Sequence, residues 1–256
     1  MIGLLLEIVS YMLLGAALGA LLFTFRGRLG FFHGVFTSAG ALLLSAVVNI
    51  YRAGRLSGTN IILAQIDEAA ALIGQALESL PPGQAQRVFG VFAAEHLTVV
   101  KELYTVMFPS ILILNTLLLS YAAYMAVKQV LALLKRDVSR HPKFSELKLR
   151  RSAAVALGVS YLLPLLAPRH IVFAAISNIT VVISGVAFVC GLSFADFKVR
   201  RVLKSAWIRL TVYIAAFFVV SVALPLLMLG FALIAVADAF LDFRGLRRRE
   251  VSDDGQ

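Results

Sequence analysis

Five polar residues stand inside otherwise apolar blocks of the sequence and are the first candidates for chemistry. They are Asn115, Ser177, Asn178, Thr180 and Ser184. Ser177, Thr180 and Ser184 follow i, i+3, i+7 spacing, which places them on one face of a helix. Because a polar group inside a membrane is costly unless it is paired, this face either hydrogen-bonds a neighbouring helix or lines a cavity for a small molecule. The sequence leaves both interpretations open.

A second group of candidates is charged and lies near the ends of apolar blocks. Its members are Asp196, Arg200, Asp238, Asp242 and Arg244. Asp196 precedes Arg200 by four residues, which is the favourable order for an ion pair on a helix. Asp238 and Asp242 are one turn apart and could hold a cation. The adjacent Arg244 favours the other interpretation, a charge network that ties helix ends together.

The sequence contains none of the motifs that mark common enzymes. We find no Gly-rich phosphate loop ending in Lys-Ser/Thr, no His-Glu-x-x-His and no Gly-x-Ser-x-Gly. The histidines at positions 33, 96, 141 and 170 form no ligand pair, and a single cysteine, Cys190, permits no internal disulfide. We therefore predict no catalytic site, no metal and no cofactor.

The segments that position these residues are strongly apolar. Of the 256 residues 60% are hydrophobic and 15% are charged, and the mean hydropathy is +0.90. Soluble domains are about 45–50% apolar and about 25% charged, so the composition excludes a soluble enzyme, a disordered protein and a disulfide-rich secreted module. We predict an all-α fold, a polytopic transmembrane helix bundle that forms one integral membrane domain over residues 1–256.

The apolar blocks predict about seven membrane spans. The blocks are Ile2–Phe25, Leu29–Ile50, Met107–Val127, Ser152–Ala167, Ile171–Phe194 and Ser205–Leu241. As one helix the last block would be about 55 Å long at 1.5 Å per residue, against a hydrocarbon core of about 30 Å. We therefore expect two helices with a break at Ser221–Pro225, where proline disfavours helix in the preceding residue. A single helix there would leave six spans.

Between the spans we expect one sizeable external segment. Residues 1–50 form two spans, residues 51–106 an amphipathic helical hairpin outside the membrane, residues 107–249 the remaining spans with basic loops, and residues 250–256 a short polar tail. Pro81-Pro82-Gly83 ends the first arm of the hairpin, and Gln84–Glu102 forms the second. The basic stretch Lys135–Arg151 is predicted to form a short helix on the membrane surface.

The distribution of charge predicts an orientation. With seven spans, 19 of the 24 Lys and Arg residues fall on one side, and that side is cytoplasmic by the positive-inside rule. We therefore expect a protein of the bacterial cytoplasmic (inner) membrane with its amino terminus outside and its carboxyl terminus inside. The net charge of +10 is explained by contact of these loops with anionic lipid headgroups and requires no nucleic acid.

Four pieces of sequence, in this order, resemble the YybS-like family of predicted bacterial membrane proteins. They are Phe108–Leu112, Pro142–Leu147, Gly191–Phe197 and Asp238–Arg244, and the resemblance covers about Pro109–Arg249. The family is similar in topology to the substrate-binding membrane components of energy-coupling vitamin transporters. Such a likeness implies a separate ATPase partner, because this chain has no nucleotide-binding motif.

Two functional hypotheses follow. In the first, the chain is a small-molecule-binding or transport component, with Asn115, Ser177, Asn178, Thr180 and Ser184 lining the site. In the second, it is a non-transporting membrane scaffold or assembly factor that acts through the external hairpin and the basic loops. The two differ in whether the polar face borders a cavity or a neighbouring helix.

Overall fold

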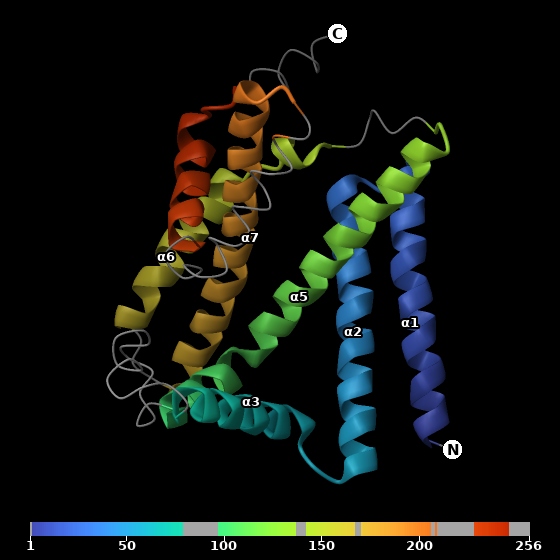
Figure 1. Cartoon of the computed structure of the whole chain (residues 1–256), viewed down its shortest axis with the longest axis vertical. Helices are drawn as coiled ribbons and strands as arrows, with labels where there is room; N and C mark the ends of the chain where they lie inside the picture. Colours follow the sequence, from blue (N-terminus) through green and yellow to red (C-terminus); the bar gives the residue numbers. More distant parts are fainter. Residues whose placement is uncertain are drawn as a thin grey trace. The chain divides into compact units, whose positions relative to one another are not determined.

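A computed structural model describes residues 2–78, 97–136, 142–166, 170–205, 208 and 228–245 (Figure 1). All regular secondary structure in this part of the chain is helical, so the prediction of an all-α protein is confirmed. The chain divides into two compact units, Met1–Val138 and Ser139–Gln256. We call them the amino-terminal and the carboxyl-terminal unit and describe each by itself.

The amino-terminal unit begins with a helical hairpin. Helix α1 spans Ile2–Phe25 and α2 spans Phe31–Ser57, and the two lie side by side in opposite directions (Figure 1). The turn between them uses the left-handed φ of 73° at Gly27, which glycine adopts without steric cost. A Cβ on Gly34 would collide with the Thr24 side chain, so this glycine allows the close approach of α1 and α2.

Helix α5, Leu97–Leu133, crosses α2 and completes the core of this unit (Figure 1). The ring of Tyr124, fully buried, lies 4.9 Å between centroids from the rings of both Phe25 and Phe31. The hydroxyl of Ser120 donates a hydrogen bond of 2.8 Å to the carbonyl oxygen of Val35. Aromatic packing and this bond together fix α5 on the hairpin.

Helix α3, Ile61–Glu78, runs across the end of the unit where α2 ends and α5 begins (Figure 1). Asp67 of α3 forms an ion pair with Lys101 of α5, with Oδ1 and Nζ 2.8 Å apart. Ala70 of α3 is buried. Helix α3 corresponds to the first predicted arm of the hairpin. Most of the second arm and Pro81–Gly83 lie outside the described residues, and α5 begins within the predicted second arm. Helix α2 extends further into the segment of residues 51–106 than expected.

The carboxyl-terminal unit consists of α6, Arg151–Leu166, α7, His170–Val202, and the helix Met228–Leu241, which is red in Figure 1. Its core is built mainly from small residues, among them Ala154, Ala187 and Ala235. A Cβ on Gly191 of α7 would collide with the backbone carbonyl of Phe231. The backbones of these two helices therefore touch at Gly191.

The prediction of a surface helix over Lys135–Arg151 is wrong for the part of this stretch that the structure describes. Only the 3-10 turn η2, Phe144–Glu146, forms there, and the next four residues are not helical. Ser193 Oγ of α7 lies 2.6 and 2.8 Å from the carbonyl oxygens of Phe144 and Leu147, so contacts with α7 hold this segment. Because Ser145 and Leu149 are buried, this segment packs on the unit instead of lying flat on a membrane.

Among the described residues, four helices are long and apolar enough to cross a membrane: Gly3–Phe25, Phe31–Ser57, Lys101–Leu133 and Phe173–Val202. These four agree with predicted spans. Two shorter apolar helices, Arg151–Leu163 and Met228–Leu241, coincide in position with two further predicted spans. The predicted break at Ser221–Pro225 lies outside the described residues, so the count of seven spans remains a prediction.

Candidate functional site

Asn115 lies near the middle of the apolar part of α5, in the amino-terminal unit. Its side chain is exposed, and no hydrogen-bond partner is found for it among the residues that the structure describes. The next residue, Thr116, is buried and donates its hydroxyl to the Ile113 carbonyl of its own helix at 2.9 Å. Thr116 therefore has a hydrogen-bond partner within its own helix, whereas the Asn115 amide has none among the described residues.

The other four polar candidates lie on α7, in the carboxyl-terminal unit, and two of them bond to α6. The single hydroxyl proton of Thr180 is shared between the Ile176 carbonyl oxygen, 2.9 Å from Oγ1, and the Ser160 carbonyl oxygen of α6, 3.2 Å from it. Ser184 lies 3.0 Å from the hydroxyl of Tyr161. At least part of this polar face is thus used to join α6 to α7.

Ser177 and Asn178 lie toward the beginning of α7 and are both half-buried. The Asn178 amide donates to the Ala174 carbonyl one turn earlier, at 2.9 Å. The candidates Asn115 and Ser177–Ser184 belong to different units. The structure therefore groups the α7 residues with α6, and the grouping of Asn115 with them remains a prediction.

The replacement Thr180→Val should lower the free energy of unfolding by only about 0.6 kcal/mol, the average for a hydrogen bond between membrane helices. Valine keeps the shape of threonine and removes the bond to Ser160. Thermal unfolding in detergent measures the change, and Thr105→Val, whose exposed hydroxyl bonds only its own helix at Lys101, is the control. A loss of several kcal/mol would contradict a simple packing role for Thr180.

The strongest polar structure in the described chain is a buried ion pair in the carboxyl-terminal unit. Arg244 and Asp238 expose 5% and 0% of their surfaces, and Nε and Nη2 of Arg244 lie 2.9 and 2.8 Å from Asp238 Oδ2. The helix ends at Leu241, and Asp242 takes a left-handed φ of 51°, which aspartate tolerates better than most residues. The resulting turn brings Arg244 back toward Asp238.

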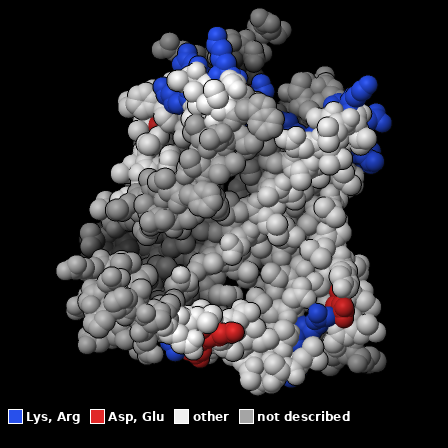
Figure 2. Space-filling view, viewed as in Figure 1, with Lys and Arg blue, Asp and Glu red and all other residues white. Residues whose placement is uncertain are grey.

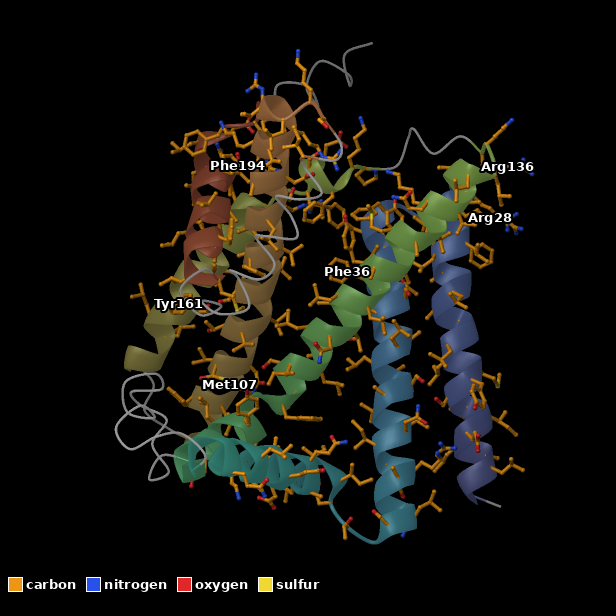
Figure 3. All side chains as sticks on the ribbon, in the orientation of Figure 1. Arg28, Phe36, Met107, Arg136, Tyr161 and Phe194 are labelled. Atoms are coloured by element: carbon orange, nitrogen blue, oxygen red, sulfur yellow. The ribbon has the colours of Figure 1, made fainter. Side chains whose placement is uncertain are left out.

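The guanidinium of Arg244 also holds the segment of residues 144–148 against α7. Its Nη1 donates to the carbonyl of Ser145 at 2.9 Å and to Ser193 Oγ of α7 at 3.0 Å, and its Nη2 donates to the Leu147 carbonyl at 2.8 Å. The ring of Phe194, labelled in Figure 3, lies 5.8 Å from its Cζ. One side chain thus joins three separate segments of this unit.

Two further ion pairs lie in the same unit. Asp196 is buried, and its Oδ1 and Oδ2 lie 2.9 and 2.8 Å from Nε of Arg200, which donates to them. Asp242 pairs with Lys148, so Asp238 and Asp242, which could have shared a cation, each have a basic partner. Among the described residues no group of three or more His, Cys, Asp and Glu side chains is placed to hold a metal ion.

One comparison with known proteins decides the family. Residues 1–238 match the family described as "Predicted membrane protein (DUF2232)". The chain belongs to this family. No curated protein and no solved structure matches it. The DUF2232 match and the apolar helices together make the chain a membrane protein of α-helical type.

Sequence reasoning missed two features of this DUF2232 protein. The first is the role of Ser193 and of the Ser145 and Leu147 carbonyls around Arg244, partners that are about 50 to 100 positions away from it in the sequence and leave no local pattern. The second is a row of polar contacts between α1 and α2.

In that row Arg52 pairs with Glu7 at 2.8 Å, Ser10 Oγ lies 2.7 Å from Ser45 Oγ, and Asn49 donates to Ser10 at 2.7 Å. Ser45, Asn49 and Arg52 follow helical spacing on α2, and Glu7 and Ser10 do so on α1. This spacing is the signal that could have revealed a polar helix–helix contact.

Proposed function

We propose that this DUF2232 protein binds a small molecule among its membrane-spanning helices and is the binding component of a transport system. The observation that supports the proposal most is Asn115, an exposed amide near the middle of the span Lys101–Leu133 that has no partner among the described residues. In hydrocarbon a polar group without a hydrogen bond costs several kcal/mol. A ligand held at this depth would satisfy the amide, and intramembrane polar residues commonly mark substrate pathways.

The transport system requires an energy source outside this chain. No nucleotide-binding motif is present in the sequence, so a separate ATPase partner supplies the energy. The resemblance to the YybS-like family, and through it to substrate-binding components of energy-coupling transporters, supports this arrangement. The chain lies in the bacterial cytoplasmic membrane with its amino terminus outside, as the distribution of Lys and Arg favours.

The test is to identify the small molecules that accompany the protein out of its native membrane. The protein is extracted in polymer-bounded lipid discs, and bound molecules are identified by mass spectrometry for the wild type, Asn115→Leu and Thr116→Val. We expect one compound to be enriched with the wild type and Thr116→Val. Its occupancy should fall about tenfold in Asn115→Leu, because the loss of one hydrogen bond to a ligand costs about 1.4 kcal/mol. Equal retention by all three forms would contradict a binding role for Asn115.

The alternative is a non-transporting membrane scaffold or assembly factor. The bonds from Thr180 and Ser184 to α6 favour it, because they use the polar face of α7 for helix packing. The same extraction distinguishes the two functions. A stoichiometric protein partner without any enriched compound would support the scaffold and contradict the transport component.

A further inference from the structure

We propose that the amino-terminal unit has a binding site for the phosphate group of an anionic phospholipid. The site consists of Arg26, Arg28, Lys135 and Arg136, which we call the basic end. Arg26 and Arg28 belong to the turn between α1 and α2, and Lys135 and Arg136 directly follow α5. Figure 3 shows Arg28 and Arg136 at the same end of the unit although about 100 residues separate them in the sequence. All four side chains are exposed.

The two ends of this unit differ in their acidic residues. Figure 2 shows Lys and Arg side chains gathered where α1 and α5 end, whereas at the opposite end acidic side chains lie beside Lys and Arg. The acidic residues whose side chains the structure describes in this unit are Glu7, Asp67, Glu68 and Glu102, and each belongs to the beginning of α1 or α5 or to α3. Counting Asp137, which follows Arg136 in the sequence and lies outside the described residues, the basic end still has a net positive charge.

A cluster of positive charges would by itself attract any anion. The surroundings of the basic end narrow the choice, because large apolar side chains are exposed beside the cations. Phe32 and Leu133 expose 50% and 82% of their surfaces. The guanidinium carbon of Arg28 lies 5.9 Å from the centroid of the Phe23 ring, itself exposed. Water would contact this apolar surface in a soluble protein, whereas acyl chains cover it in a membrane.

A phospholipid offers both parts that the basic end requires. Its phosphate can accept paired hydrogen bonds from the planar guanidinium of arginine, and its chains can cover the adjoining Phe and Leu side chains. A soluble phosphate would satisfy only the cations. Basic residues next to a membrane span attract anionic headgroups. The site therefore takes an anionic phospholipid, and this inference does not depend on the proposed transport function.

The test compares lipid preference in defined bilayers. The full chain is placed in nanodiscs containing phosphatidylglycerol and phosphatidylcholine, and the lipids retained after ejection from the disc are counted by native mass spectrometry. The variant Arg28→Gln/Arg136→Gln removes one cation from each segment of the site. Arg55→Gln is the matched control, because Arg55 is exposed near the end of α2 at the opposite end of the unit.

We expect the wild type and Arg55→Gln to retain phosphatidylglycerol over phosphatidylcholine. The double variant should lose about tenfold or more of that preference, a change equivalent to about 1.4 kcal/mol. Thermal unfolding in pure phosphatidylcholine shows whether the double variant remains folded. Should it unfold, Arg26→Gln/Lys135→Gln on the same end must show the same loss. An undiminished preference for phosphatidylglycerol in either folded variant would overturn the proposal. Displacement of the retained lipid by millimolar inorganic phosphate would also overturn it, because it would indicate a site for a soluble anion.

Discussion

Replacing Arg244 with leucine should lower the free energy of unfolding of the carboxyl-terminal unit by about 3–5 kcal/mol, the cost of breaking a buried ion pair by removing one partner. Asp238, with 0% exposure, would be left as a buried charge without its counter-ion. The carbonyls of Ser145 and Leu147 would lose their guanidinium donor as well. Thermal unfolding in detergent, followed by circular dichroism, measures the loss.

Two further variants separate the buried pair from a general effect of losing arginine. Arg201→Leu removes an exposed arginine at the end of α7 and should change stability by less than about 0.5 kcal/mol. The double variant Arg244→Leu/Asp238→Leu removes both charges. It should be more stable than Arg244→Leu alone, because no buried charge remains. Equal stability of Arg244→Leu and Arg201→Leu would contradict the role assigned to the buried pair.

The replacement Gly191→Ala should destabilise the same unit by about 1–3 kcal/mol, as overpacking of a tight contact does. The new methyl group would meet the carbonyl oxygen and carbon of Phe231, so α7 and the helix Met228–Leu241 would have to separate. Backbone atoms cannot move aside as a flexible side chain can. The midpoint of thermal unfolding is the measurement.

Gly158→Ala is the matched control for this prediction. Gly158 lies within α6, and a Cβ there would meet nothing within 4 Å. Both replacements gain about 1 kcal/mol of helix propensity, so the difference between them isolates the collision at Gly191. If Gly191→Ala were as stable as Gly158→Ala, the close contact would not exist in the folded protein.

The spans could be predicted from the sequence because each depends on local hydropathy. Ile2–Phe25 appears in the structure with the predicted bounds as α1. Helix α2 is longer than the predicted span Leu29–Ile50 and α5 is longer than the predicted span Met107–Val127, because polar residues do not end a helix by themselves. Arg52 is held by Glu7 and Lys101 by Asp67, so both helices continue past their apolar parts.

The segment around Phe144 could not be predicted in the same way. Its basic, amphipathic sequence is typical of a surface helix, but its backbone carbonyls bond to Ser193 and Arg244, residues that come near only when the unit folds. Similarly, i, i+4 spacing predicts the pair of Asp196 and Arg200, whereas no spacing rule connects Lys148 to Asp242. Local pairs are visible in a sequence, and contacts across a fold are not.

The most direct test of the proposed binding function is the accessibility of Asn115 to a water-soluble thiol reagent. Cys190 is the only cysteine, so Cys190→Ala provides a background for Asn115→Cys and, as a control, Leu18→Cys, an exposed apolar position within the span of α1. In intact membranes we predict that Asn115→Cys reacts, that Leu18→Cys in lipid does not, and that the ligand slows the reaction. Failure of Asn115→Cys to react, like Leu18→Cys, would place Asn115 against lipid or a dry partner and contradict a ligand cavity there.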